Sequence, residues 1–190
     1  HLKFLVNKLE KIGVSAVVIE DKIGIKINSL FKDQSNTKQD TISNFCKKIK
    51  IMCNSRVNND FIIISRIESL ILGKGVQDAL KRANSYSKAG ADMILIHSNK
   101  KTPAEIFKFA KQFKKSKYFK PLVAVPSTYP SVTDTDLVKH GFKIVIYANH
   151  LLRTSYLSMK KTLMSILKNG QAFKAQKDMI SIKEIIQMLK

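Results

Sequence analysis

The sequence predicts an α/β fold made of repeated strand–helix units. Five short runs of β-branched and other apolar residues each end in polar residues, and segments with helical signals separate them. Continuous apolar runs of this kind are typical of parallel strands covered on both faces, whereas half-exposed strands alternate apolar and polar residues. The predicted strands are Val14–Ile19, Phe61–Ser65, Met93–His97, Leu122–Val125 and Ile144–Tyr147.

Capping signals predict where several helices begin. A Ser or Thr followed three residues later by an acidic residue is the pattern of a helix N-terminus, and proline is favoured in the first turn. The pattern occurs at Thr102 with Pro103 and Glu105, at Thr133 with Asp136, and at Ser181 with Glu184. The last of these predicts a terminal helix over residues 181–189.

Glycine marks the passage from helix to strand three times. Gly13, Gly90 and Gly141 each follow a predicted helix and precede a predicted strand, where a left-handed C-cap residue is favoured. The segments "KLEKIGVSAVVIED", "YSKAGADMILIHS" and "LVKHGFKIVIYANH" therefore follow one pattern. A repeating βα array is expected, in which each unit needs its neighbours to bury its apolar faces.

The number of units decides between two architectures. Five units cannot close an eight-stranded barrel, and an open arc of five strands would expose two edges. We expect residues 1–190 to form one domain, the C-terminal five βα units of a TIM-type (β/α)8 barrel, with about three further N-terminal strands outside this sequence. The alternative is a five-stranded doubly wound sheet, which needs no further strands.

Composition bears on the partners. The chain has 34 Lys and Arg against 14 Asp and Glu, a formal charge of +20 that could favour nucleic acid. The lysines are spread over nearly every predicted helix and are not interleaved with aromatic residues, so nucleic acid is an unlikely partner. The longest apolar stretches are too short to cross a bilayer, so no membrane partner is expected.

Cysteine usage predicts a cytoplasmic protein. Cys46 and Cys53 lie seven residues apart on a predicted helix, and no metal-ligand residues accompany them in the sequence pattern. The chain does not open with a charged and apolar leader. We therefore expect two structural thiols in a reducing compartment.

Polar residues follow every predicted strand, and in parallel α/β folds the active site lies at these C-terminal ends. They are Glu20, Asp21 and Lys22 after the first strand, Arg66 and Glu68 after the second, His97 and Ser98 after the third, Ser127 and Thr128 after the fourth, and Asn149 and His150 after the fifth. The Arg66 guanidinium suits a phosphoryl or carboxylate group, although a structural Arg66–Glu68 pair is the alternative. His97 is either a second donor to an anion or a strand-end histidine satisfied by its surroundings.

Residues 21–40 form a long polar segment of mostly irregular sequence. Loops of this length in compact domains are usually functional, so we predict a gating loop that brings Lys26, Asn28 and Ser29 to a substrate and excludes water. The alternative is an ordinary surface loop.

Part of this segment resembles the signature motif of a known family. The sequence "EDKIGIKINSL", residues 20–30, resembles the E-D-K-x-x-x-K-x-N-S-L signature of the phosphoenolpyruvate mutase branch of the isocitrate lyase superfamily. Residues 65–98, "VAVPSTY" from Val123 and "IVIYANHLLR" from Ile144 resemble that family in the same order, so the resemblance covers essentially the whole chain. The K-[KR]-C-G-H motif of the lyase branches is absent, which argues against cysteine-dependent lyase chemistry.

The resemblance implies an activity and roles for several residues. It implies an isomerase that interconverts phosphoenolpyruvate and phosphonopyruvate by intramolecular phosphoryl transfer, as in phosphonate biosynthesis, with Mg²⁺ as cofactor. Phosphonopyruvate hydrolase and a catalytically incomplete barrel fragment are the alternatives. By the same resemblance Glu20 belongs to the Mg²⁺ shell through water, Arg66 and His97 hold the phosphoryl group, and Lys26, Asn28 and Ser29 come from the gating loop. The family's principal Mg²⁺ aspartates lie on earlier strands that this sequence lacks. The apolar face of Ser181–Leu189 further suggests a homo-oligomer.

Overall fold

The computed structural model describes residues 1–25, 28–29, 34 and 37–189. By its internal contacts the chain divides into two compact units, His1–Tyr147 and Ala148–Lys190. The predicted fifth βα unit is therefore split, because its strand belongs to the first unit and the helix that follows belongs to the second.

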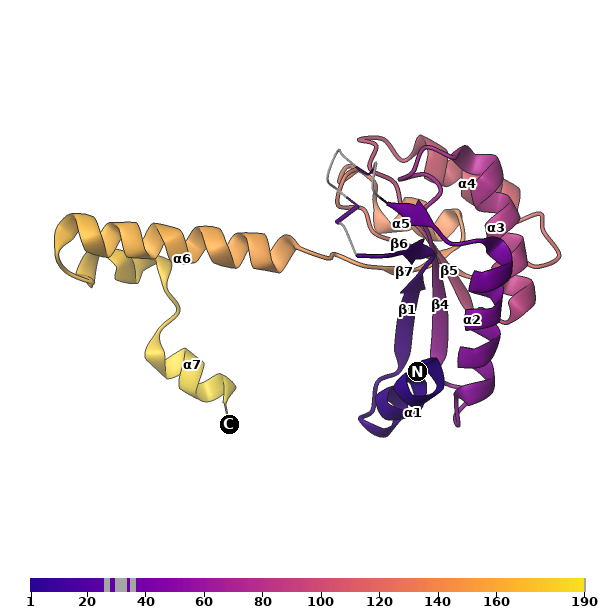
Figure 1. The fold of residues 1–190 in the computed structure, drawn as a ribbon. Coiled ribbons are helices and arrows are strands. Elements are labelled where there is room, and N and C mark those ends of the chain that lie inside the picture. The colour runs from indigo at the N-terminus through magenta and orange to yellow at the C-terminus, as the bar shows by residue number, and fades with distance from the viewer. Residues whose placement is uncertain (26–27, 30–33, 35–36, 190) are drawn as a thin grey trace. The chain divides into compact units, whose positions relative to one another are not determined.

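The first unit is built on a parallel sheet of five strands (Figure 1). The strands, in both chain order and sheet order, are β1 (Ala16–Glu20), β4 (Ile62–Ile67), β5 (Met93–Ile96), β6 (Leu122–Ala124) and β7 (Phe142–Val145). All five predicted strands are present, with ends shifted by at most two residues, so the prediction of an α/β fold is confirmed. A small antiparallel pair, β2 (Lys22–Ile23) with β3 (Lys38–Gln39), was not predicted.

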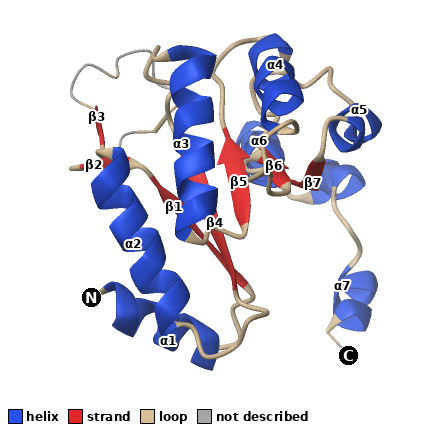
Figure 2. Cartoon of the chain, turned by 90° about the vertical axis from the view of Figure 1, so that its right-hand side faces the viewer, coloured by secondary structure: helices blue, strands red, loops and turns tan. Residues whose placement is uncertain are grey.

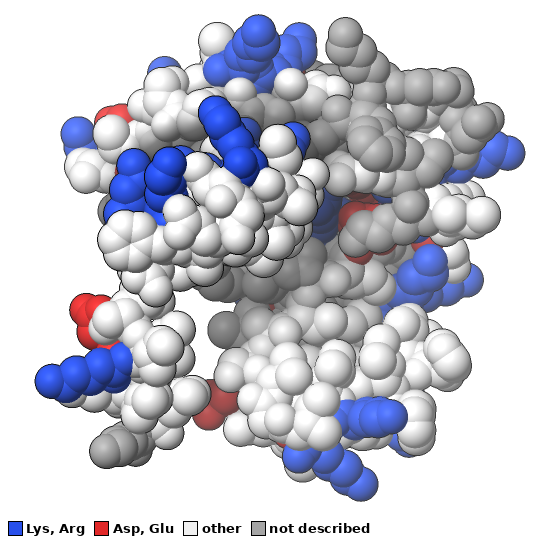
Figure 3. Space-filling view, turned by 90° about the vertical axis from the view of Figure 1, so that its left-hand side faces the viewer, with Lys and Arg blue, Asp and Glu red and all other residues white. Residues whose placement is uncertain are grey.

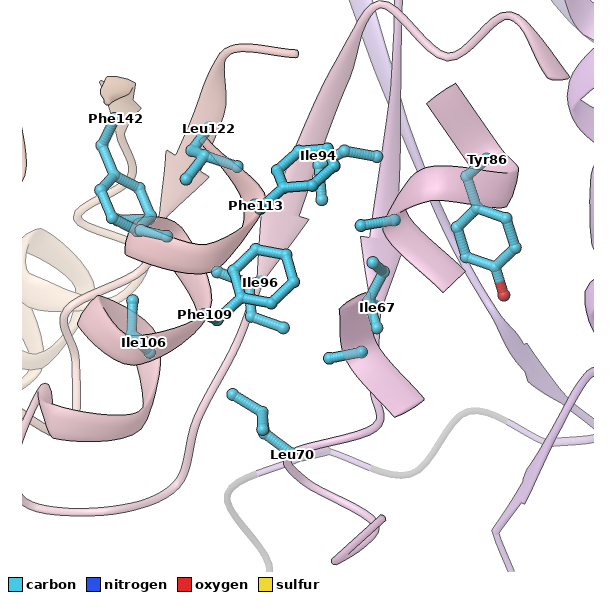
Figure 4. Close-up of a cluster of buried hydrophobic side chains, with 14 of the residues drawn as sticks. Ile67, Leu70, Tyr86, Ile94, Ile96, Ile106, Phe109, Phe113, Leu122 and Phe142 are labelled. Atoms are coloured by element: carbon cyan, nitrogen blue, oxygen red, sulfur yellow. The ribbon is translucent and has the colours of Figure 1, made fainter. Parts of the chain in front are cut away.

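The helices of the first unit cover one face of this sheet (Figure 2). They are α1 (Leu2–Lys11), α2 (Ile42–Ser55), α3 (Gly75–Ala89), α4 (Ala104–Phe113) and α5 (Asp134–Lys139). Because strand side chains alternate between faces, the strands supply every second residue to this layer. Ile67, Ile94 and Ile96 pack there against Tyr86 of α3 and Phe113 of α4, all fully buried (Figure 4).

The order of the strands favours the barrel over the doubly wound sheet. Neighbouring strands follow one another along the chain without a reversal, and α1 also packs on the covered face, since Val6 contacts the cluster around Ile63. A doubly wound sheet reverses its strand order and carries helices on both faces. A sequential arc with its helices on one side is the arrangement of a (β/α)8 barrel.

Helices begin at or within one residue of all three predicted starts, and two of the three predicted caps are confirmed. The Thr133 side chain accepts a hydrogen bond from the Asp136 N–H, and Ser181 with Glu184 forms a complete capping box. The third predicted cap, a box between Thr102 and Glu105, was wrong, because α4 begins at Ala104 with Pro103 at its N-cap and makes no side-chain cap bond. Glu105 accepts a hydrogen bond from the Ser98 hydroxyl at the end of β5 instead.

The predicted glycine caps are confirmed, and Gly90 shows why glycine is needed. Its φ is +115°, in the left-handed region, and a Cβ there would lie 3.0 Å from the Cys53 Sγ. The Cys53 thiol itself donates to the Gly90 carbonyl at 3.2 Å, and the Cys46 thiol donates to Ser85 at 3.5 Å. Burial raises the pKa of both thiols, so they are protonated packing groups, as a structural role requires.

The second unit consists of α6 (His150–Asn169), the 3₁₀ helix η1 (Phe173–Asp178) and α7 (Ile182–Met188). An ion pair between Lys161 and Asp178, at 2.9 Å, joins α6 to η1. No residue of α6 is buried, and its apolar side chains, among them Leu157 and Leu163, are exposed. Among the described helices of the chain, none is long and apolar enough to cross a bilayer.

Candidate functional site

The face of the sheet opposite the helices of the first unit is called the uncovered face here, because none of those helices lies on it, although its central side chains are buried. It carries apolar residues in its middle and charged residues at its C-terminal end. Ile64, Leu95 and Val123 form a separate apolar cluster on this face. The same alternation places Arg66 and His97, two residues further along their strands, on that face too. Glu20 is the register partner of Arg66 across β1 and β4. The sheet thus brings together three of the predicted site residues at the strand ends.

A buried carboxylate organises the charges at this end. Glu68 is fully buried and lies between two cations, with its Oε1 at 2.6 Å from the Arg66 Nε and its Oε2 at 3.0 Å from the Lys22 Nζ. Burial raises the pKa of Glu68, but the Arg66 guanidinium and the hydrogen bonds that Glu68 accepts outweigh this and hold the pKa below its ordinary value. Glu68 is therefore ionised at neutral pH, and the predicted Arg66–Glu68 pair is present.

Of Lys26, Asn28 and Ser29, the three residues predicted to act from the gating loop, Ser29 is seen at this centre among the described residues. Its hydroxyl donates to the Glu68 Oε2 at 2.7 Å and accepts from the Arg66 Nη2 at 2.8 Å. Asn28 is exposed, and its backbone carbonyl accepts a hydrogen bond from Gln34. Lys26 lies outside the described residues. The gating function of residues 21–40 stays a prediction.

Glu20 is the carboxylate at this end that suits a divalent cation. Its Oε2 lies 3.6 Å from the Arg66 Nε, and its side chain is 17% exposed. The other two carboxylates nearby are committed, Asp21 to a set of buried donors and Glu68 to its two cations. Within the described residues no three His, Cys, Asp or Glu side chains converge as a metal-binding group. The Glu20 carboxylate fits Mg²⁺ either as an outer ligand that acts through water or as one of several direct ligands. Mg²⁺ takes hard oxygen ligands and keeps much of its hydration shell.

His97 is a buried neutral imidazole. Burial and then the nearby positive charge of Arg66 lower the pKa of His97 to about 4, so the ring is uncharged at neutral pH. Its Nδ1 is buried without a hydrogen-bond partner among the described residues. The sequence left two hypotheses for His97, a donor to an anion and a histidine satisfied by its surroundings. The unpartnered Nδ1 favours the first.

This pKa predicts a pH dependence of stability. A histidine with a lowered folded pKa favours the native state above its unfolded pKa of about 6.5, and this contribution is lost as the pH falls through the folded value. Between pH 6.5 and 4 we expect His97 to account for a fall of about 3 kcal/mol in the free energy of unfolding. Urea titrations at several pH values check this, since His97→Gln should remove that part of the slope. The matched control is His140→Gln at the end of α5, and an equal change in both variants would contradict the assignment.

Two of the other strand-end residues, Ser98 and Thr128, have partners in the loops. The Ser98 hydroxyl donates to Glu105, and the Thr128 hydroxyl donates to the Ser98 carbonyl at 2.8 Å, so both stabilise the loops. Asn149 and His150 belong to the second unit.

Sequence reasoning missed the residues that support the site. Lys22 was noted only as a charged residue after a strand, yet its side chain is 4% exposed and paired with Glu68. Arg82 and Tyr86 of α3 were not singled out, although both contact the buried Asp21. Nothing in their spacing signals this, because the partners are more than sixty residues apart in the chain.

The surface charge is divided among several places. Figure 3 shows Lys and Arg side chains in separate groups on the face drawn there, with uncharged surface between them.

Comparison with known proteins identifies chains of similar sequence and fold. The family model described as phosphoenolpyruvate phosphomutase matches residues 1–167. The phosphonopyruvate hydrolase of Variovorax sp. (strain Pal2) is 38% identical over 191 residues, which cover 99% of this chain and 64% of that protein.

Two solved structures extend the likeness to the fold. The crystal structure of phosphoenolpyruvate phosphomutase from Streptomyces platensis subsp. rosaceus matches with a TM-score of 0.92 and 31% identity, covering 98% of this chain and 63% of the other. A phosphonopyruvate hydrolase in complex with oxalate and Mg²⁺ matches with a TM-score of 0.88 and 36% identity, covering 99% and 63%. The chain thus spans somewhat less than two thirds of the length of these relatives.

Proposed function

The chain belongs to the phosphoenolpyruvate phosphomutase family, and from this premise we propose that it forms the C-terminal part of a (β/α)8-barrel enzyme that interconverts phosphoenolpyruvate and phosphonopyruvate. The observation that carries the proposal is the convergence of Arg66, His97 and Glu20 on the uncovered face of the sheet, at the C-terminal ends of its strands. A parallel barrel places its active site there.

Arg66 and His97 bind the phosphoryl group in this proposal. Phosphoryl transfer depends mostly on positioning and on stabilising the charge of the transferred group, and a planar guanidinium can bind two of its oxygens at once. The neutral His97 donates an uncharged N–H beside it. Glu68 holds the Arg66 guanidinium from behind through Nε, and Ser29 contacts the Nη2. Lys26 and Asn28 complete the substrate contacts from the predicted gating loop.

Mg²⁺ is the proposed cofactor. When bound, it supplies positive charge that neutralises the substrate oxygens. The resemblance assigns Glu20 to its shell, and the partly exposed Glu20 carboxylate beside Arg66 supports an outer position through water. Cytoplasmic location is part of the proposal and is supported by the two free cysteines.

A second candidate is phosphonopyruvate hydrolase, favoured by the 38% identity to a protein of that name. In that reaction water breaks the C–P bond, and pyruvate and inorganic phosphate are released. In the mutase reaction the phosphoryl group moves from carbon to oxygen of the same molecule, and nothing is released.

A product assay tests both candidates. The full-length protein is incubated with phosphonopyruvate and Mg²⁺, and the phosphorus-containing products are followed by ³¹P NMR. We expect phosphoenolpyruvate to accumulate without inorganic phosphate. Phosphate with an equal amount of pyruvate would establish the hydrolase instead. If neither phosphoenolpyruvate nor phosphate forms, the proposal is overturned.

Replacing Glu20 with alanine should raise the Mg²⁺ concentration needed for half-maximal activity about 10- to 100-fold, because groups in the outer shell orient the metal and its waters. A Mg²⁺ titration of activity measures this, and Mn²⁺ binding followed by electron paramagnetic resonance gives a readout independent of turnover. The matched control is Glu10→Ala, since Glu10 is a carboxylate on α1 that accepts hydrogen bonds from the Val57 and Asn58 amides. An unchanged Mg²⁺ requirement in Glu20→Ala would contradict the metal assignment.

A homo-oligomer is also proposed. The exposed leucines of α6, among them Leu157 at 67% and Leu163 at 60%, leave an apolar surface that a second copy of the chain would cover. Light scattering coupled to size exclusion is expected to give a mass above that of one chain. The double variant Leu157→Asp with Leu163→Asp should lower that mass, and a monomeric wild-type protein would contradict the proposal.

A further inference from the structure

Asp21, next to Glu20 at the end of β1, is a carboxylate that accepts four hydrogen bonds from described residues. It is fully buried. Its Oδ2 accepts from the Tyr86 hydroxyl at 2.7 Å, from the Gln39 amide at 2.9 Å and from the Arg82 Nη1 at 3.2 Å. Its Oδ1 accepts from the Glu68 N–H at 3.0 Å. Both oxygens of this buried carboxylate are thus bound by donors of the protein itself.

Arg82 and Tyr86 connect Asp21 to α3. They lie four residues apart, so they occupy one face of the helix. The Arg82 Nη1 donates to the Tyr86 hydroxyl at 2.8 Å and to the Asp40 carbonyl at 2.9 Å. Asp40 in turn donates its N–H to the Asp21 carbonyl at 2.7 Å. Both ends of segment 21–40 are thus fastened to each other and to α3.

The same contacts reach the charged centre. The Asp21 N–H donates to the Arg66 carbonyl at 3.1 Å, and the Asp21 side chain holds the Glu68 N–H. Asp21 therefore holds the backbone between Arg66 and Glu68 at two points. Its own neighbours, Glu20 and Lys22, supply two further charges of the site. A shift of Asp21 would change all of these positions together.

We propose that Asp21, Arg82 and Tyr86 form a positioning cluster, which sets the backbone at the ends of β1 and β4 and both ends of segment 21–40 for the reaction. The expected effect on turnover rests on the proposed function. The expected effect on the backbone rests on the hydrogen bonds alone. None of the three residues contacts the substrate. They act through Glu68, Arg66 and Glu20, so their loss should affect turnover more than substrate affinity.

The variant Tyr86→Phe tests the cluster, because it keeps the ring packed against Phe45 at 4.6 Å between centroids and removes only the hydroxyl. Amide hydrogen exchange is measured by NMR on the full-length protein. We expect the Asp40 and Glu68 amides to exchange about tenfold faster than in wild type, as the loss of a hydrogen bond to a charged group implies. The Ile94 amide, bonded to the Pro121 carbonyl in the core, should be unchanged.

The matched control is Tyr129→Phe, which removes the hydroxyl of another fully buried tyrosine that takes no part in the cluster. It should leave the Asp40 and Glu68 amides within twofold of wild type. If Tyr86→Phe does the same, the cluster does not fix these segments and the inference is overturned. Arg82→Lys, which cannot reproduce the fork of donors, is the second variant and should show the same local increase.

Kinetics separate positioning from a purely structural role. With phosphonopyruvate, Tyr86→Phe should lower kcat about tenfold with KM within twofold of wild type, whereas Tyr129→Phe should change neither. Faster exchange with an unchanged kcat would overturn the catalytic part of the inference. If the wild-type protein does not act on phosphonopyruvate at all, the proposed function fails, and the exchange measurements still decide whether the cluster fixes the segment.

Discussion

Replacing Arg66 with alanine is expected to lower kcat/KM for phosphonopyruvate about 1000-fold, which is the scale of losing a preorganised charged donor to a transition state. Arg66 lies at the end of β4 on the uncovered face, and its guanidinium is 19% exposed, so it can reach a ligand while Glu68 holds it. Because Arg66 does not fill the apolar core, the variant should keep its fold. Steady-state kinetics on the full-length protein, with circular dichroism as a check on folding, measure the effect.

Arg56→Ala is the matched control. Arg56 is also a partly buried arginine in a carboxylate pair, with its Nη1 at 2.6 Å from Asp92, and it donates to the Phe61 carbonyl at the opposite end of β4. Its loss should reduce stability and leave kcat/KM of the folded protein unchanged. Equal kcat/KM in Arg66→Ala and wild type would remove Arg66 from the proposed site.

Replacing Phe113 with alanine is expected to lower the free energy of unfolding of the first unit by about 4 kcal/mol, the usual cost of deleting a buried aromatic ring. Phe113 is fully buried between helix and sheet, with the rings of Phe109 and Phe119 each centred 5.5 Å away (Figure 4). The packed rings leave little room for the structure to collapse into the cavity. Urea denaturation followed by circular dichroism provides the measurement.

Phe4→Ala removes the same side chain from a place where it is 70% exposed, on α1. Surface substitutions of this kind usually change stability by no more than about 0.5 kcal/mol. A loss below about 1 kcal/mol in Phe113→Ala would mean that the helix layer is not the core on which the site depends.

The elements of the fold were predictable because their signals are local. The run Phe61–Ser65 and the glycine before Ala91 depend on residues close together in the chain, and the structure places β4 and the C-cap of α3 there. The cap of α4 was not predictable in the same way. Thr102 and Glu105 have the spacing of a capping box, but Glu105 bonds to Ser98 at the end of β5. A contact with a neighbouring strand outweighed the local pattern.

The sequence by itself determined that charged residues gather at the strand ends, and that Glu20, Arg66 and His97 are the candidates for chemistry. It did so because parallel strands bring their C-terminal ends to one edge whatever their loops contain. Only the tertiary structure decided which of these charges meet. Glu68 is buried between Lys22 and Arg66, and Asp21 is held by Arg82 and Tyr86 from another helix. Apart from the Arg66–Glu68 pair, these pairings depend on contacts between residues more than forty positions apart. The state of a buried charge is set by its three-dimensional neighbours, which composition and spacing do not contain.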